Sequence, residues 1–396
     1  MRSSKKKKKK ASHNTAAADD VTFSDLPNHI TCDILSRLPL NSIFAFKRVC
    51  KLWRDLTLEP YFAKLHLSRS PLSLFFYHDG NDNNNNNNSP SSHFEIIPLH
   101  DHLALGRRNR AMKFRTEIHF PHMHAQVVAS CNGSILLRNS SSSDDDLVTV
   151  CNPLRAQHFI LPEPPKLALQ THKSILFGFG HSSSTDQYKV LRLTHMGSPA
   201  RLYCDVYAIG IDDEWRSIGY TGQPPTRIIS QLVFLNGALH WIGIEKSRFI
   251  YSFDIEKEQF GSFPLPSCIE EDCNCLGVVD NWLYLHNETQ SIAWRIWAMK
   301  DYGDFGSWTL EWFIKEPIIY MFTGSVEPLK VLKDGSLLMK FTKTNLRTQV
   351  IKTTLASYNP QTRVLKKIKY HVTLPRTRRA SVADIPCFVS PMDALK

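Results

Sequence analysis

The sequence lacks any long apolar run. No stretch of the 396 residues reaches the roughly 18 consecutive apolar residues that a membrane-spanning helix needs. The lysines at residues 5–10 are not followed by an apolar segment, so we expect neither a secretory signal nor membrane binding. Apolar residues make up 42% of the chain and charged residues 21%, which is ordinary for a folded protein. We therefore expect a globular protein in a reducing compartment.

A regular cysteine framework is also missing. The nine cysteines are an odd number and are scattered along the chain, so we expect reduced and mostly buried thiols. Cys268, Cys273 and Cys275 lie close together, but their spacing lacks the paired pattern of zinc modules. A histidine-rich stretch comprises His100, His102, His119, His122 and His124. Solvated imidazoles on a surface strand explain it better than a metal site. We expect no metal and no other cofactor.

Positive charge is confined largely to the N-terminus. Arg2 and the lysines at residues 5–10 carry seven charges, and removing them from the net charge of +11 leaves +4 for the rest of the chain. A body so close to neutral argues against a nucleic-acid partner. Short lysine tracts are typical of nuclear import signals, although a solvated terminal tail has the same composition. The residues of the predicted signal are Lys5, Lys6, Lys7, Lys8, Lys9 and Lys10. We expect the protein in the nucleus and the cytoplasm.

No catalytic motif stands out. The chain contains no Ser-His-Asp spacing, phosphate-binding loop or metalloprotease motif. The acidic run Asp144–Asp146 lies in a polar tract and is read as a loop, not as a pair of catalytic carboxylates. We therefore expect a protein that is not an enzyme.

The chain divides into three regions by pattern. Residues 1–22 are polar and without an apolar period, which predicts a disordered basic tail. Residues 23–66 predict a small all-α unit of three helices, since Ile30, Ile34 and Leu38 recur on one helical face and Pro39 disfavours continuation of that helix. A second helix is predicted from about Ser42 to Arg48, and a third carries Trp53.

Residues 72–396 predict an all-β domain. Short apolar or alternating runs such as SILLR (134–138), ALHWIG (238–243) and WLYLH (282–286) follow turn signals. The turn signals are Asn132-Gly133, Asn236-Gly237, Asp280-Asn281 and Asp334-Gly335. The polar tracts at 83–88 and 140–146 are expected to be loops.

An internal repeat organises this β region. A strand, a polar turn and an aromatic or apolar strand recur around Asn152, Asp212, Asp254, Asp301 and Asn359, at steps between 42 and 60 residues. Each interval also holds a second strand pair, and four strands per roughly 40–50 residues is the period of a β-propeller blade. A closed ring leaves no exposed sheet edge, which favours a propeller of about six blades over an open sandwich of stacked hairpins. Residues 73–99 are expected to add a partial blade.

The helical unit resembles the F-box. Leu26-Pro27, Ile34-Leu35-Ser36-Arg37-Leu38-Pro39, Val49-Cys50-Lys51-Leu52-Trp53 and Phe62 follow that family's motif in order. The resemblance implies a Skp-type adaptor as partner and, through it, a cullin. A unit this small also has more apolar positions than its own core can hold, so the surplus is expected to face a partner. The predicted adaptor-binding residues are Leu26, Pro27, Ile30, Ile34, Leu35, Leu38, Pro39, Leu40, Ile43, Val49, Cys50 and Trp53.

The β region resembles the F-box-associated domain of plant F-box proteins, which is related to kelch propellers. The matching phrases include SCNGSILL (130–137), CNPLRAQHFILP (151–162), VFLNGALHWIG (233–243) and FDIEKEQFGSFPLP (253–266). The resemblance implies a protein-binding platform and names no catalytic residue. Together the two resemblances imply the substrate-recognition subunit of a Skp-cullin-F-box (SCF-type) ubiquitin ligase, which recruits a target protein for ubiquitination and proteasomal degradation.

Two other functions stay open at this point. A kelch-like propeller enzyme would need convergent Cys, Tyr and His side chains or paired carboxylates at the ring centre. An F-box protein acting with the adaptor outside ubiquitin transfer would not bring a cullin with it. The protein substrate and its binding residues are not identified by the sequence, because loops carry specificity with little pattern. We further expect the two domains to have separate cores, joined near residues 66–72.

Overall fold

The computed structural model describes residues 26–78, 93–99, 114–117, 125–140, 146–166, 173–197, 200–219, 225–245, 247–266, 269, 273–287, 293–315, 325–345, 350–368 and 381–395. The predicted import signal at residues 5–10 and the whole histidine-rich stretch lie outside them. Among the described residues, no helix combines the length and the apolar character needed to cross a membrane.

The N-terminal unit contains four helices, one more than expected: α1 (Asn28–Leu35), α2 (Leu40–Phe46), α3 (Lys51–Leu56) and α4 (Pro60–Arg69). Prolines set three of the starts. Pro27 and Pro39 are the residues just before α1 and α2, and Pro60 opens α4. Proline fits there because the first-turn N–H that it lacks has no partner within the helix. The fourth helix continues beyond the predicted boundary at residue 66.

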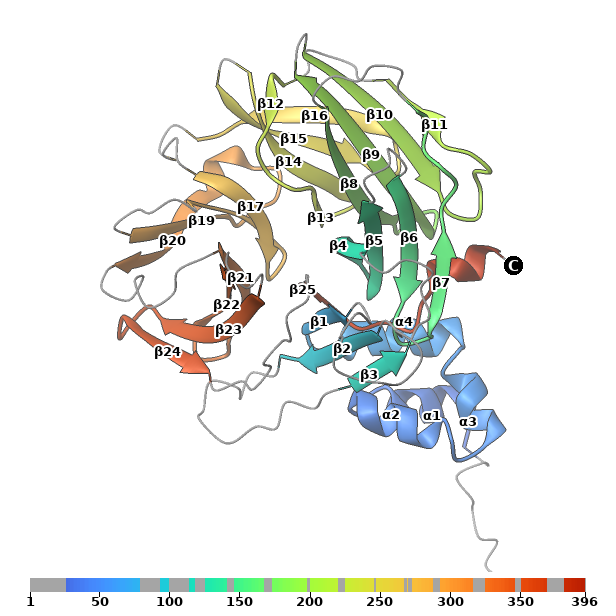
Figure 1. The fold of residues 1–396 in the computed structure, drawn as a ribbon. Helices are drawn as coiled ribbons and strands as arrows, with labels where there is room; N and C mark the ends of the chain where they lie inside the picture. The colour runs from blue at the N-terminus through green and yellow to red at the C-terminus, as the bar shows by residue number, and fades with distance from the viewer. Residues whose placement is uncertain are drawn as a thin grey trace, which may run out of the picture.

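The described residues from Ser73 onward form six antiparallel sheets arranged in a ring (Figure 1). Blade 1 contains β25 (Ser381–Asp384), β1 (Ser73–His78), β2 (His93–Pro98) and β3 (Phe114–Glu117). Blade 2 contains β4 (Ala125–Cys131), β5 (Ser134–Ser140), β6 (Asp146–Asn152) and β7 (Gln157–Ile160). Blade 3 contains β8 (Lys173–Ser182), β9 (Gln187–Gly197), β10 (Ala200–Ala208) and β11 (Arg216–Ser217).

The remaining three blades follow the same order along the chain. Blade 4 contains β12 (Arg227–Ile228), β13 (Val233–Leu235), β14 (Ala238–Ile244), β15 (Arg248–Asp254) and β16 (Gln259–Pro264). Blade 5 contains β17 (Cys273–Val279), β18 (Trp282–Asn287), β19 (Ala293–Met299) and β20 (Trp308–Lys315). Blade 6 contains β21 (Ser325–Val331), β22 (Leu337–Asn345), β23 (Val350–Asn359) and β24 (Val364–Ile368). The predicted six-bladed propeller is therefore confirmed.

Blade 1 closes the ring with strands from both ends of the β region. β25 pairs antiparallel with β1, so that Asp384 lies opposite Ser73 and Ser381 opposite Phe76. The innermost strands contact their neighbours around the ring: β25 contacts β4, β4 contacts β8, β8 contacts β13, β13 contacts β17, and β17 contacts β21. This pairing gives the closing blade its innermost strand and joins the two ends of the β region in one sheet. Residues 73–99 thus form part of a blade, as predicted.

Each predicted turn signal joins two strands of the innermost hairpin of a blade. The four hairpins are β4–β5, β13–β14, β17–β18 and β21–β22. Asn132 and Gly133 have φ of 50° and 72°, and Asn236 and Gly237 have φ of 49° and 77°. Two successive residues with positive φ make the type I′ turn that matches the twist of a β-hairpin. Asparagine and glycine tolerate this conformation at low cost, which explains why the sequence marks these turns so clearly.

The repeated phrase corresponds to the hairpin between the last two strands of a blade. In blade 2 the Asn152 side-chain oxygen accepts hydrogen bonds from the backbone N–H groups of Leu154 (3.0 Å) and Arg155 (3.2 Å). Asp254 and Asn359 make the same pair of bonds in blades 4 and 6. In each of these blades, a short polar side chain at the end of the next-to-last strand thus caps the turn.

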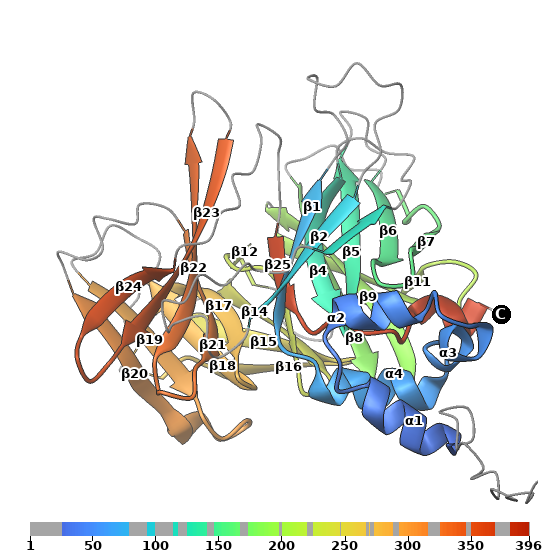
Figure 2. The ribbon, with the colours of Figure 1, turned by 90° about the horizontal axis from the view of Figure 1, so that it is seen from below.

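Six apolar clusters hold the ring together, one at each junction between neighbouring blades. The junction of blades 3 and 4, for example, buries Trp241 and Phe253 completely. The junction of blades 1 and 2 differs, because the helices add to it. Figure 2 shows α1–α4 together with the C-terminal end of the chain on one side of the blades.

The helices and the propeller share one core, which corrects the expectation of separate cores. Leu35, Ile43 and Phe62 of the helices belong to the same buried cluster as Phe75 of β1 and Ile135 of β5. The helical unit is too small to bury its apolar residues by itself, so it covers them against the nearest blades. Residues 70–72 are a short connection within a continuous structure.

Candidate functional site

Helix α1 presents a row of apolar side chains to solvent. Ile30 and Ile34 are each 40% exposed, and Leu38, just after the helix, is 36% exposed. The spacing of four residues places them on one face, as the sequence predicts. The opposite face of the same helix carries Cys32 and Leu35, which are buried in the core shared with the propeller. The helix therefore has two apolar faces and covers only one of them.

Further exposed apolar side chains follow at the junction of α2 and α3. Val49 is 66% exposed, the highest value among the large apolar side chains of the described residues, and Leu52 is 46% exposed. Cys50 is exposed between them. Trp53 is half-buried and meets Phe46 edge-on, with ring centroids 5.7 Å apart. Leu26 is likewise half-buried, and Pro27 and Pro39 are exposed.

Three of the residues predicted to bind the adaptor lie on the inner side. Leu35, Leu40 and Ile43 are 3%, 7% and 0% exposed and belong to the core shared with the propeller. Because their side chains are covered by the chain itself, they have almost no surface to offer a partner. The structure separates the twelve predicted residues into an outer set of nine and this inner set of three.

An ion pair connects helix α1 to helix α4. The Asp33 carboxylate of α1 receives Arg69 of α4 at 2.6 Å and Arg37 at 3.0 Å. The Arg69 hydrogen bond to this carboxylate, supported by Arg37, lowers the pKa of Asp33. Between residues 26 and 70, seven basic residues outnumber three acidic ones. The exposed apolar surface of the helical unit therefore belongs to a region of net positive charge.

The ring has two unlike faces, defined by the direction of its strands. In blades 2–6 the turn of the innermost hairpin and the turn between the last two strands lie on one face, here called the turn face. This is the face of the helices, because Lys64 of α4 pairs with Asp186 of the β8–β9 turn at 3.2 Å. The other face, here called the loop face, has the strand ends joined by residues 79–92, 118–124, 141–145, 316–324 and 369–380.

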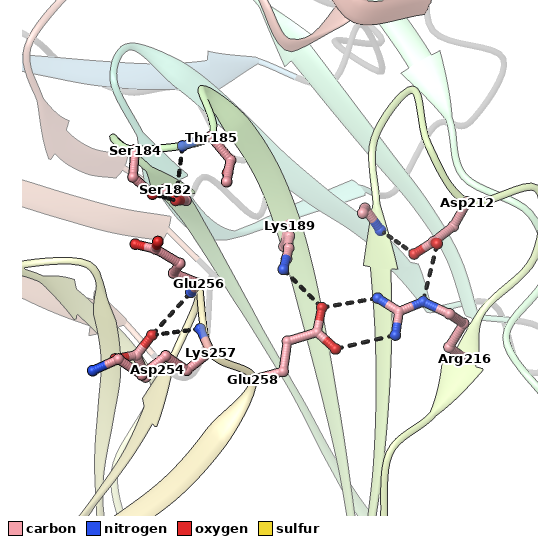
Figure 3. Close-up of polar contacts among 11 residues, drawn as sticks. Ser182, Ser184, Thr185, Lys189, Asp212, Arg216, Asp254, Glu256, Lys257 and Glu258 are labelled. Carbon is pink, nitrogen blue, oxygen red and sulfur yellow. Dashed lines mark hydrogen bonds and ion pairs between the residues drawn. The ribbon is translucent and has the colours of Figure 1, made fainter.

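A polar network crosses the turn face between blades 3 and 4 (Figure 3). Glu258 receives Arg216 through two bonds of 2.8 and 3.0 Å and receives the Lys189 ammonium at 2.7 Å. Arg216 also donates to Asp212 at 3.0 Å. The hydrogen bond from Arg216, the largest of several causes, lowers the pKa of Glu258. Both Glu258 and Asp212 have a basic partner, and the network links blades 3 and 4.

Only some of the residues considered for metal binding lie in the described part of the chain. No group of three or more His, Cys, Asp or Glu side chains there is arranged to hold a metal ion. Cys275 is half-buried in β17. The histidine-rich stretch and Cys268 lie outside the described residues.

Sequence reasoning missed the C-terminal segment as part of this region. Residues 385–395 follow β25 and lie against both the helices and blade 2, with Cys387 and Phe388 0% and 1% exposed. The available signal was the apolar phrase IPCFVSPM at 385–392, which follows a polar stretch and carries two prolines. It has no period that identifies a partner.

Solved structures resemble the ring only weakly. TolB from Acinetobacter baumannii has a TM-score of 0.43 at 7% identity, covering 79% of this chain and 70% of TolB. Prolyl oligopeptidase B from Galerina marginata has a TM-score of 0.38 at 10% identity over 80% of this chain. The matched part is 40% of that enzyme's chain. Values this low carry no argument about function.

Family models match both parts of the chain. The F-box domain matches residues 23–65, and the F-box associated beta propeller domain matches residues 103–323. F-box protein At3g07870 of Arabidopsis thaliana is 27% identical over 73% of this chain and 72% of its own length. F-box/kelch-repeat protein At3g23880 of the same plant is 24% identical over 72% of this chain and 78% of its own. The chain therefore belongs to the plant-type F-box proteins that carry an F-box associated beta propeller domain.

Proposed function

We propose that this chain is the substrate-receiving subunit of a Skp-cullin-F-box ubiquitin ligase. The observation that carries the proposal is the exposed row Ile30, Ile34 and Leu38 on a helix whose other apolar face is already buried. A contiguous exposed apolar surface of this kind marks a protein interface. An F-box domain implies a Skp-type adaptor as the partner that covers it.

The adaptor contact is proposed for the outer set only. Ile30, Ile34 and Leu38 form its centre, with Leu26, Pro27, Pro39, Val49, Cys50 and Trp53 around them. The inner residues Leu35, Leu40 and Ile43 act indirectly, because they hold the helices in place against the propeller. Exposed Arg48, Lys51 and Arg54 border the apolar surface and favour an acidic partner face.

The protein target is proposed to bind on the loop face. The turn face is partly covered by α4 and the C-terminal segment, whereas the loop face lies away from them. Loops on a rigid scaffold carry binding specificity. The segments that join strands there differ in length and composition, among them the asparagine run at 83–88 and the acidic run at 144–146.

The chain itself performs no chemistry in this proposal. A ubiquitin-conjugating enzyme elsewhere in the complex acts on the target lysine, and the cullin joins that enzyme to the adaptor. The receptor contributes proximity, since holding the target beside the enzyme raises its effective concentration. The ion-paired carboxylates of the turn face and the absence of a catalytic motif in the sequence agree with a non-catalytic subunit.

Nuclear entry is proposed for part of the protein, with the lysines at residues 5–10 as the import signal. Deleting residues 1–12 is expected to lower the nuclear share of the protein without changing adaptor binding, because the tail precedes the helices. An unchanged distribution in cells would show that the lysines are not an import signal.

Co-purification tests the proposed function. The intact chain is expected to bring down both a Skp-type adaptor and a cullin, whereas the double variant Ile30→Ala, Ile34→Ala loses both. A matched control is the double variant Ile211→Ala, Val364→Ala, which removes two propeller side chains of similar exposure, 57% and 44%. Adaptor without cullin would indicate a function outside ubiquitin transfer. Equal capture by all three proteins would refute the proposed adaptor surface.

A further inference from the structure

The C-terminal segment contacts the helices through a cluster of aromatic rings. The Phe388 ring centroid lies 5.1 Å from His66, 5.7 Å from Phe62 and 5.9 Å from Phe44. Both α4 and α2 are therefore in contact with a residue that lies at the other end of the chain. Buried aromatic contacts of this kind fix relative orientation because the rings interdigitate at close range.

The same segment is held to blade 2 by hydrogen bonds. The Asn152 side-chain amide donates to the backbone carbonyls of Cys387 at 3.1 Å and Val389 at 2.7 Å. Arg155 forms an ion pair with Asp393. Asn152 is 0% exposed, and its oxygen caps the β6–β7 turn at the same time. One side chain thus joins a propeller turn to the C-terminal segment.

The C-terminal segment is held in place on both sides of its contact with the helices. β25, which ends at Asp384, is paired with β1 and fixes the start of the segment. Gly210 of blade 3 lies so close to the far end that an added Cβ would be 2.5 Å from the Ala394 carbonyl oxygen. The segment is therefore fixed at both ends while its middle contacts the helices.

We infer that residues 385–395 are a clamp that sets the angle between the F-box helices and the propeller. Phe388 and Asn152 are its positioning residues: neither contacts the adaptor or the target in the proposed arrangement. The consequence for ubiquitin transfer rests on the proposed function, because only then does the clamp fix the distance from the adaptor surface to the loop face. Transfer needs the target lysine held within reach of the conjugating enzyme.

Two matched variants test the clamp. Asn152→Asp keeps an oxygen to cap the β6–β7 turn but replaces the amide donor, so that a carboxylate faces the carbonyls of Cys387 and Val389. Asn359→Asp makes the same change at the equivalent turn of blade 6, where the cap is present. Hydrogen–deuterium exchange is measured on the full chain. Backbone exchange in α2 and α4 is expected to rise about tenfold in Asn152→Asp and to stay unchanged in Asn359→Asp.

A second pair of variants controls for a general loss of folding. Phe388→Ala removes the clamp ring, and Phe179→Ala removes an equally buried ring that pairs with Tyr188 inside the propeller at 5.7 Å. Faster exchange confined to α2 and α4 in Phe388→Ala, but not in Phe179→Ala, supports the clamp. Unchanged exchange of these helices in both Asn152→Asp and Phe388→Ala would overturn it.

Ubiquitin transfer gives the functional readout. An epitope placed in the asparagine run at 83–88, which joins β1 to β2 in the sequence, recruits a lysine-bearing nanobody as a model target. The clamp variants are expected to bind adaptor and nanobody as the intact chain does, yet to transfer ubiquitin about threefold more slowly or worse. Unchanged transfer despite faster exchange would overturn the positioning role. If the intact chain binds no adaptor, the proposed function fails, and exchange alone still decides the clamp.

Discussion

The rings of Phe62 in helix α4 and Phe388 near the C-terminus lie 5.7 Å apart, inclined at 54°, and both are buried. This contact joins the two ends of the described chain beside the junction of blades 1 and 2. The helical unit is therefore continuous with the ring that follows it. Substitutions in this region should change stability and domain orientation together.

Gly133 and Gly237 should respond differently to the same substitution. Both have positive φ, 72° and 77°, so alanine costs about 1 kcal/mol at either position from backbone strain. At Gly133 an added Cβ would also lie 2.4 Å from the backbone nitrogen of Cys387, whereas Gly237 has open space. We expect Gly133→Ala to lower the free energy of unfolding by about 3 kcal/mol or more. Urea unfolding of the two variants measures the difference, and equal losses would contradict the close approach.

Acid should weaken the packing of helix α4. Burial lowers the pKa of His66 to about 4, below its ordinary value of 6.5. The folded state therefore resists protonation that the unfolded chain accepts, so stability is full above pH 6.5 and falls as the pH drops toward 4. Between pH 7.5 and pH 5 the intact chain should lose about 2 kcal/mol from this residue. Urea unfolding of His66→Phe, which keeps a ring beside Phe388 but cannot be protonated, should show a correspondingly smaller pH dependence.

Glu258 should contribute stability by neutralising a buried lysine. Lys189 is 7% exposed and has the Glu258 carboxylate at 2.7 Å. Glu258→Gln should cost about 2 kcal/mol, because the ammonium group stays buried without its counter-charge. Lys257→Gln removes an exposed pair with Asp254 at 3.6 Å and should cost less than about 0.5 kcal/mol. Thermal unfolding compares the two variants, and equal losses of stability would show that the buried pair contributes no more than the exposed one.

Removing the helices should destabilise the propeller. A fragment of residues 71–396 uncovers Phe75 and Ile135, which the helices help to bury. We expect it to aggregate or to melt at a clearly lower temperature than the intact chain, because newly exposed apolar surface promotes association. A fragment of residues 13–396, which lacks only the lysine run, should melt as the intact chain does. Equal melting of the two fragments would show that the shared core is dispensable.

Local signals predicted much of the fold. Asn132-Gly133 and Asn236-Gly237 mark tight turns because positive φ is costly for other residues, so the turn chemistry is written into the sequence itself. The caps at Asn152, Asp254 and Asn359 repeat because the backbone N–H groups of each turn need an acceptor. This repetition allows the blade period to be recognised in the sequence. Local backbone demands of this kind need no knowledge of distant contacts.

The missed features depend on contacts between distant residues. Helix α4 has no clear helical period of apolar residues, and it buries Phe62, Ala63 and His66 where the propeller and Phe388 cover them. The sequence showed that the helical unit has more apolar positions than its own core can hold, but it did not show which of them the propeller covers. Residues 62 and 388 are brought together by ring closure, which no local period encodes. The shared core was missed for this reason.

The most direct measurement of the central claim is the half-life of proteins captured by the propeller in cells. A point variant suits this better than a fragment, because the helices share their core with the ring. Proteins labelled by proximity to the intact chain, with the proteasome blocked, are identified first, and their half-lives are then measured without the block. The account predicts short half-lives with the intact chain, and accumulation with Ile30→Ala, Ile34→Ala, which binds the same proteins but has lost about 3 kcal/mol of adaptor affinity. Equally short half-lives with both proteins would contradict the account of this chain as a receptor that joins its target to a ligase.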